Sequence, residues 1–230
     1  MKTKQKVEKS HKQPLAVTAY EAIVQRIICL EYQPSQHLEE GQLMEDLNIG
    51  RTPVREALVR LHGEKMVESH PNKGVIVRPI TLQNTKAMFE SMSIFEFGVA
   101  DIAATKNCTI AIQKMKESNA AIEKTVLAHD LLGLVEANHQ FHMDFAQASQ
   151  NEFLIRATHD VRNEAKRLSY LSFNTAIDPD QSLETHYDSV VSEHEKIISF
   201  LEAKEIPALK QLLQDHIDTF RRRIIQFMVS

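Results

Sequence analysis

Helical periodicity over residues 81–228 is the feature that most constrains how this chain can fold. Apolar side chains recur there at every third or fourth position, which is the spacing of one buried face of a helix. Breaks such as Glu205-Ile206-Pro207 divide the region into six stretches, at about 82–106, 109–128, 130–148, 151–173, 180–203 and 205–228. Six helices can bury a core of their own, so we predict an all-α six-helix bundle over residues 80–230.

The first eighty residues follow a different plan. Residues 1–14 contain five lysines and almost no apolar side chains, which predicts a disordered basic tail. Helices are expected at about 15–31, at 39–47 and within 49–61, followed by two β-type runs at 66–69 and 75–78 around a turn. Three helices and a hairpin make a winged helix-turn-helix, which we place at residues 15–79 with Pro79 at its end. The predicted fold class is therefore mainly α.

Residues 49–61 have the pattern of a recognition helix. Thr52 followed by Pro53 predicts the helix start, because a threonine side chain can cap free amides and an early proline loses no hydrogen bond. The apolar stripe that would face the core consists of Val54, Ala57, Leu58 and Leu61. An ordinary amphipathic helix with solvated arginines would explain this stripe equally well, but not the order of elements around it. The residues predicted to contact DNA, including the wing tip, are Arg51, Thr52, Arg55, Lys73 and Gly74.

Composition and charge favour a soluble globular protein whose N-terminal part suits a polyanion. Of the 230 residues, 43% are hydrophobic and 25% are charged, which is ordinary for that class. Residues 1–80 hold 12 Lys and Arg against 10 Asp and Glu, whereas the remainder holds 15 against 21. No run approaches the roughly eighteen apolar residues of a membrane span, and no signal peptide is evident. We expect a cytoplasmic protein with no membrane partner, in which Cys29 and Cys108 are free thiols.

Three of the eleven histidines interrupt apolar rows of the predicted bundle helices. His142, His194 and His216 would each face the core from a different helix, and a buried imidazole needs a partner for each nitrogen. One shared divalent metal would satisfy all three, with Asn138 as a fourth ligand directly or through water. Zinc is the first choice, and nickel and manganese are alternatives. The competing interpretation is that each histidine has a separate hydrogen-bonded place in the core.

Residues 43–61, LMEDLNIGRTPVREALVRL, resemble the signature of GntR-family transcription regulators. The resemblance implies that Arg51, Thr52 and Arg55 bind operator DNA and that the wing glycine, Gly74, assists them. Two positions depart from the family pattern. Gly50 stands where a serine or threonine is usual, and Lys65 stands where the family has glycine after the recognition helix. Neither change should abolish DNA binding.

The bundle resembles the FCD effector domain of the FadR branch of that family, and its six helices are closer to the VanR-type subgroup. Segments 138–142, 148–151, 193–194 and 215–216 carry the likeness. It implies a divalent metal held by Asn138 and the three histidines, next to a pocket for a small carboxylate. Family members often carry an arginine early in the first bundle helix, where this chain has Met92. Arg162 and Arg167 could substitute for it, but we expect both on a solvated helix flank.

These features together predict a ligand-responsive, DNA-binding transcription regulator. We expect a homodimer on a palindromic operator, repression of a metabolic operon, and a small organic acid as the effector. The alternatives are a metal-dependent hydrolase and a constitutive DNA-binding factor with structural histidines. The chain has no His-Glu-x-x-His motif. Glu193 and Asp215 each precede a candidate ligand by one residue, about 100° round the helix, and are expected to be exposed or to lie just behind a ligand.

Overall fold

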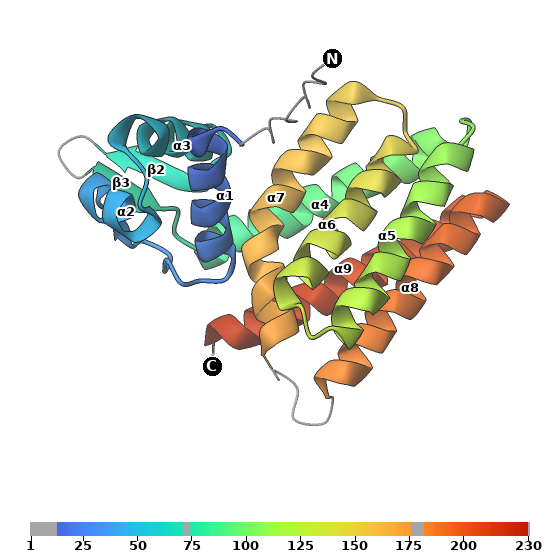
Figure 1. Cartoon of the computed structure of the whole chain (residues 1–230). Helices are drawn as coiled ribbons and strands as arrows, with labels where there is room; N and C mark the ends of the chain where they lie inside the picture. Colours follow the sequence, from blue (N-terminus) through green and yellow to red (C-terminus); the bar gives the residue numbers. More distant parts are fainter. Residues whose placement is uncertain (1–12, 71–73, 176–181, 230) are drawn as a thin grey trace, which may run out of the picture.

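The computed structural model describes residues 13–70, 74–175 and 182–229, which form two domains (Figure 1). The N-terminal reading head, residues 13–79, lies beside one flank of a helical bundle, with α1 (Leu15–Ile28) facing α7 (Glu152–Asn174). The predicted basic tail and the predicted DNA contact Lys73 fall outside the described residues, apart from Gln13 and Pro14.

The reading head contains the three predicted helices. α1 and α2 (Glu40–Leu47) both pack on α3 (Arg51–Gly63). The helices meet through fully buried side chains at the expected apolar positions, including Ile23, Ile27, Leu43, Val54 and Leu61. α1 ends at Ile28, three residues before the predicted end, because Leu30 takes a left-handed backbone conformation with φ of 59°.

The predicted start of the recognition helix was wrong by two residues. Gly50 is the N-cap, with extended backbone, and the first helical hydrogen bond runs from the Val54 amide to the Gly50 carbonyl at 3.3 Å. Thr52 therefore lies inside the first turn, is exposed, and does not cap the helix. Pro53 is tolerated because the amides of the first turn have no helical acceptor to lose. Asn48, left-handed with φ of 50°, ends α2 and creates the tight turn between the two helices.

The wing is a three-stranded antiparallel sheet in the order β1-β3-β2. β2 (Val67–His70) and β3 (Gly74–Val77) are the predicted hairpin, displaced by one residue, and β1 (His37–Leu38) was not predicted. Gly74 has φ of 73°, a conformation that favours glycine, and a Cβ there would lie 2.8 Å from His37 Nε2. The glycine therefore allows β3 to begin close against β1.

The six predicted helices of the second domain are present. They are α4 (Leu82–Ala103), α5 (Thr109–Leu127), α6 (Leu131–Gln147), α7, α8 (Leu183–Ala203) and α9 (Ile206–Val229). α5 packs against α6 and α8, while α4 packs against α7 and α9. The resulting core is aliphatic and aromatic, with Phe141, Phe145 and Ile197 almost wholly buried. In the described parts of the chain, no helix is long and apolar enough to cross a membrane.

The two domains are joined through α7. Arg78, which directly follows β3, forms an ion pair with Glu164 of α7. Arg167, one turn further along α7, donates from Nη1 to the Arg78 carbonyl at 2.5 Å and lies 3.7 Å from Glu164. The end of the wing is thus fixed to a bundle helix by both side-chain and backbone contacts.

Candidate functional site

Three histidines from three helices meet in the middle of the bundle. His142 of α6, His194 of α8 and His216 of α9 are 1%, 0% and 9% exposed. Their ring centroids form a nearly equilateral triangle, with sides of 5.2, 5.2 and 5.4 Å. Each ring offers one nitrogen that lies within 4.8 Å of those from the other two. The prediction that all three face one core is confirmed.

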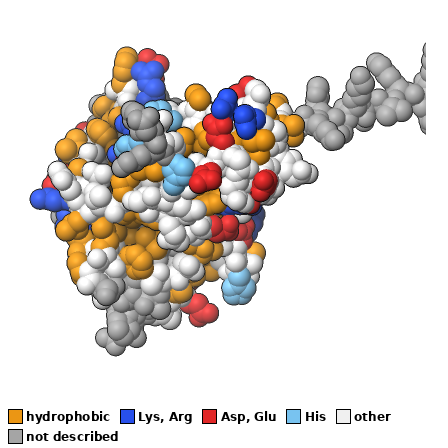
Figure 2. Space-filling view, turned by 90° about the vertical axis from the view of Figure 1, so that its left-hand side faces the viewer, with side chains coloured by type: hydrophobic (Ala, Val, Ile, Leu, Met, Phe, Trp, Pro, Cys, Tyr) orange, Lys and Arg blue, Asp and Glu red, His pale blue; other side chains and the backbone are white. Residues whose placement is uncertain are grey.

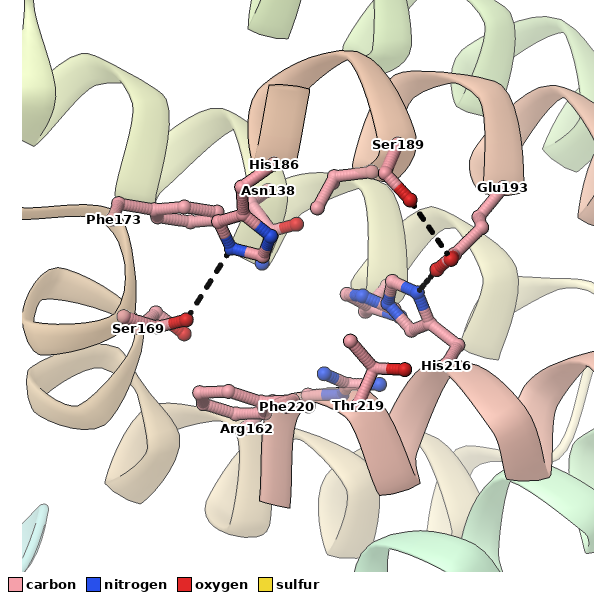
Figure 3. Close-up of a pocket in the computed structure, with 13 residues that line it drawn as sticks. Asn138, Arg162, Ser169, Phe173, His186, Ser189, Glu193, His216, Thr219 and Phe220 are labelled. Carbon is pink, nitrogen blue, oxygen red and sulfur yellow. Dashed lines mark hydrogen bonds and ion pairs between the residues drawn. The ribbon is translucent and has the colours of Figure 1, made fainter. Parts of the chain in front are cut away.

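Neighbouring acceptors orient two of these rings. His194 Nδ1 lies 3.1 Å from Asn119 Oδ1. His216 Nδ1 lies 2.6 Å from Glu193 Oε2, a contact that Figure 3 shows. Nδ1–H donation to these oxygens leaves the Nε2 lone pair of each ring available for another partner. An acceptor behind each imidazole is the arrangement that fixes a metal-binding histidine in position. Glu193 was expected to be exposed or just behind a candidate ligand, and its carboxylate lies against His216 Nδ1.

Three ring nitrogens of the triangle are buried without a hydrogen-bond partner in the described part of the chain. They are both ring nitrogens of His142 and Nε2 of His194. Burial, reinforced by the neighbouring His216, holds the pKa values of His142 and His194 well below their usual range. Neutral imidazoles with unpaired nitrogens facing one another are the donors that a divalent metal requires, so the residues present fit such an ion.

A small cavity lies beside the histidine triangle. It has a volume of about 30 Å³, which is room for one or two water molecules. Asn138, 8% exposed, lines this cavity. Its role as a fourth ligand stays a prediction. Aromatic rings form part of the wall, and polar side chains point inward from several helices (Figure 3). The polar and aromatic residues that line it are Asn138, His142, Arg162, Ser169, Ser172, Phe173, His186, Ser189, Glu193, His216, Thr219 and Phe220.

His186 is a lining residue that the sequence analysis missed. Burial, followed by the nearby charge of Arg223, lowers its pKa to about 4. Its Nε2 lies 3.4 Å from the Ser172 hydroxyl, so the ring is neutral and hydrogen-bonded at neutral pH. The sequence signal that could have found it is its position four residues before Val190 and eight before His194, on the same face of one helix.

The second candidate site is the outer face of α3. Arg51, Thr52 and Arg55 are all exposed there, and Gly74 is exposed at the start of β3. Arg55 Nε donates to both carboxylate oxygens of Glu40 on α2, at 3.0 and 2.8 Å. Figure 2 views the molecule from the side of the reading head and shows basic and acidic side chains close together, not one continuous basic surface. The predicted DNA contacts of these residues remain predictions.

Comparison with known families identifies the chain. Residues 15–77 match the gntR family of bacterial regulatory proteins, and residues 87–219 match the FCD domain. The chain belongs to the GntR family, in its FCD branch. The predicted architecture, a winged helix-turn-helix followed by an all-α FCD domain, is confirmed, and this GntR protein is a DNA-binding transcription regulator.

Relatives match over most of its length. The HTH-type transcriptional repressor RspR of Escherichia coli K12 is 22% identical over 218 residues, covering 93% of this chain and 90% of the relative. The Uxu operon transcriptional regulator of the same organism is 25% identical over 218 residues, covering 87% and 83%. The crystal structure of a putative GntR transcriptional regulator from Rhodococcus sp. RHA1 has the same fold, with a TM-score of 0.71, 19% identity and coverage of 91% and 97%.

The arginines of α7 correct one expectation about this GntR protein. Arg162 and Arg167 were predicted on a solvated flank, but they are 5% and 2% exposed. Arg162 pairs with Glu96 of α4, which is 1% exposed and lies 3.4 Å from His142 Nδ1. The missed signal was Glu96 itself, a charged residue in an apolar row, at the same helical spacing that revealed the histidines.

The departure at Met92 also has a structural explanation. Met92 is 2% exposed and packs with Phe89 of α4 and Leu168 of α7. It fills an apolar layer between helices and does not line the cavity. The guanidinium group at the cavity comes instead from Arg162 of α7.

Proposed function

We propose that this regulator changes its affinity for operator DNA when a small organic acid binds next to a divalent metal held by His142, His194 and His216. The observation that carries the proposal is the buried triangle of histidines, three of whose ring nitrogens have no hydrogen-bond partner among the described residues, adjacent to a cavity that contains an arginine. Zinc is the ion we expect first, and nickel or manganese would suit the same donors. When bound, the ion supplies a positive charge at the cavity wall that attracts a carboxylate.

The chain's own side chains suit an acid at that place. Arg162 offers a buried guanidinium whose Nε has no partner among the described residues, and Thr219 contributes a hydroxyl donor. The cavity is smaller than an organic acid, so we expect binding to displace water and to push side chains on α7, α8 or α9 outward. Such movement would allow the ligand to bind one conformation of the protein more tightly than another and so to favour it.

On the DNA side, we propose that Arg51, Thr52 and Arg55 of α3 enter the major groove, with Lys73 and Gly74 of the wing at the backbone or minor groove. A single recognition helix covers only a few base pairs, so a homodimer on a palindromic operator would supply the specificity. A coupling free energy of about 1–3 kcal/mol would change operator affinity by roughly 5- to 150-fold. Repression is the direction we expect, in common with the repressor RspR.

The contacts of the nearby carboxylates favour a sensor over a hydrolase. A hydrolytic metal site needs a general base close to the metal-bound water. Glu96 is ion-paired with Arg162 through Oε1, which makes it a weak base although its Oε2 has no hydrogen-bond partner among the described residues, and Glu193 is occupied by His216 and by the Ser189 hydroxyl. Both carboxylates therefore orient other groups. Turnover of ester or amide substrates by the metal-loaded protein would contradict this assignment.

The metal site is tested by metal content. We expect about one divalent ion per chain in the wild-type protein, and less than a tenth of that in His194→Ala or His216→Ala, measured by atomic emission after dialysis. His159→Ala is the matched control, because His159 is half exposed on α7 and lies outside the triangle. Equal metal content in all three variants would remove the site, and the constitutive DNA-binding alternative would then be favoured.

The recognition helix is tested by one substitution. Arg55→Ala should abolish the preference for operator over scrambled DNA while the helical circular dichroism stays unchanged, because Arg55 is exposed and contributes nothing to the core. Lys116→Ala, on α5 at the far side of the bundle, removes the same charge and should keep the preference (Figure 1). An Arg55→Ala protein that keeps both affinity and preference would contradict the assignment.

A further inference from the structure

An ion pair connects the two helices of the helix-turn-helix across its exposed face. Arg55 lies in the second turn of α3, and Glu40 is the first residue of α2. Arg55 Nε lies 2.8 and 3.0 Å from the two oxygens of Glu40, and the side chains are 59% and 37% exposed. The contact is thus made at the surface that the recognition helix offers to DNA.

The pair uses the one guanidinium nitrogen that base recognition does not need. Guanine is read by two parallel donors of an arginine, and the terminal nitrogens form such a pair. With Nε held by Glu40, the contact orients the Arg55 guanidinium and leaves its terminal nitrogens available for other partners. Among the described residues those nitrogens have no hydrogen-bond partner. Arg55 is therefore ordered before DNA arrives, so less conformational entropy remains to be lost on binding.

A carboxylate at this place is electrostatically unfavourable for DNA binding, so its presence on this surface calls for a role such as ordering Arg55. DNA phosphates repel it, so Glu40 lowers the affinity for any sequence. Glu56, on the exposed face of α3 directly after Arg55, carries the same charge and forms no ion pair within the described part of the chain. The two glutamates therefore carry the same charge, but only Glu40 forms an ion pair with Arg55.

We propose that Glu40 is a positioning residue for sequence recognition, which holds Arg55 so that its terminal nitrogens meet a base edge and not the phosphates. The inference rests on the proposed DNA contact of Arg55. Glu40 lowers the affinity for all DNA but increases the difference in affinity between the operator and other sequences.

The test compares Glu40→Asp, Glu40→Gln and the control Glu56→Gln in the full-length protein. The probes are a labelled duplex recovered by selection from random DNA with the wild-type protein, and a scrambled duplex of the same composition. Glu40→Asp keeps the charge but withdraws the carboxylate by one methylene. We expect it to lower the ratio of operator to scrambled affinity about five- to tenfold without changing the scrambled affinity.

The other variants separate charge from contact. Glu40→Gln should lower the ratio similarly and also raise the affinity for scrambled DNA, because one negative charge is removed. Glu56→Gln should raise both affinities equally and keep the wild-type ratio. An unchanged ratio in Glu40→Asp and Glu40→Gln would overturn the inference and leave the proposed function standing.

Glu40→Asp is also measured in the Arg55→Ala protein, to test whether Glu40 acts through Arg55. If Glu40 acts through Arg55, adding Glu40→Asp to Arg55→Ala should change the ratio no further. A further fall there would show that Glu40 acts through the stability of α2, whose first turn it occupies, and would also overturn the inference. If Arg55→Ala alone keeps the wild-type ratio, the assignment of the recognition residue itself is wrong.

Discussion

The buried pair of Arg162 and Glu96 gives the sharpest prediction about stability. Replacing Arg162 by methionine keeps most of the side-chain volume but leaves the Glu96 carboxylate, 1% exposed, without its cation. That carboxylate must then stay charged in an apolar core or take up a proton, and both cost free energy. Burial lowers the pKa of Arg162 only to about 9, so the wild-type guanidinium is charged at neutral pH.

The expected effect is large. Removing one partner of a buried ion pair costs about 3–5 kcal/mol of unfolding free energy. For a protein of this size each kcal/mol changes the melting temperature by about 2–4 °C, which predicts a fall of about 6–20 °C. Lys166→Met is the matched control on the same helix, because Lys166, 13% exposed, pairs at 2.8 Å with Glu136, whose 45% exposed carboxylate stays in contact with solvent when the cation is removed. A pair at the surface contributes at most about 1 kcal/mol, or about 4 °C.

The assay is thermal unfolding followed by circular dichroism, with a chelator present because metal bound to the native state would itself raise the melting temperature. The double variant Glu96→Leu/Arg162→Met should recover most of the loss, since apolar residues can replace a buried ion pair. A melting temperature of Arg162→Met no lower than that of Lys166→Met would contradict the prediction. A double variant no more stable than Arg162→Met alone would contradict it as well.

Three further predictions concern pH, metal affinity and coupling. Because the folded-state pKa of His186, about 4, lies below the unfolded value of about 6.5, the unfolded chain takes up the proton first and stability falls as pH drops through this window. His186→Phe should therefore reduce the pH dependence of the melting temperature between about pH 6.5 and 4; an unchanged slope would contradict it. Glu193→Gln should weaken zinc binding about 10- to 100-fold in competition with a chromophoric chelator, because one ligand loses its orienting acceptor; equal affinity would exclude that role. Arg78→Ala breaks the contact with Glu164, so the change in operator affinity on adding zinc chloride should shrink towards none, whereas a full response would show that coupling takes another route.

Much of the fold followed from the sequence because each helix of the bundle has one clear apolar face. The same pattern revealed the histidines, since a polar residue in an apolar row must find a partner inside the core. His142, His194 and His216 are buried together for this reason. To predict that they meet, it was enough that three core-facing side chains share one core, and no long-range contact had to be known.

The places where prediction failed depend on partners distant in the sequence. α7 contacts the bundle helices α4, α6, α8 and α9 and also α1 of the reading head, so more than one of its faces is buried. Periodicity assigns a helix one buried face and one solvated face, and it therefore placed Arg162 and Arg167 in solvent. Their partners, Glu96 and the Arg78 carbonyl, lie 66 and 89 positions away. The short strand β1 was missed because its pairing with β3 is likewise a long-range contact.

The geometry of α7 links the two sites. Arg162 and Glu164 are two residues apart, so their side chains leave the helix about 200° apart and face opposite directions. Arg162 points toward the bundle interior, where Glu96 connects it to His142, and Glu164 points toward the reading head, where it holds Arg78. A helix is stiff, so a rotation that a ligand imposes at Arg162 must also move Glu164. The effect of a ligand can therefore reach the wing through one rigid element, and the Arg78–Glu164 contact is where we expect that route to be most easily broken.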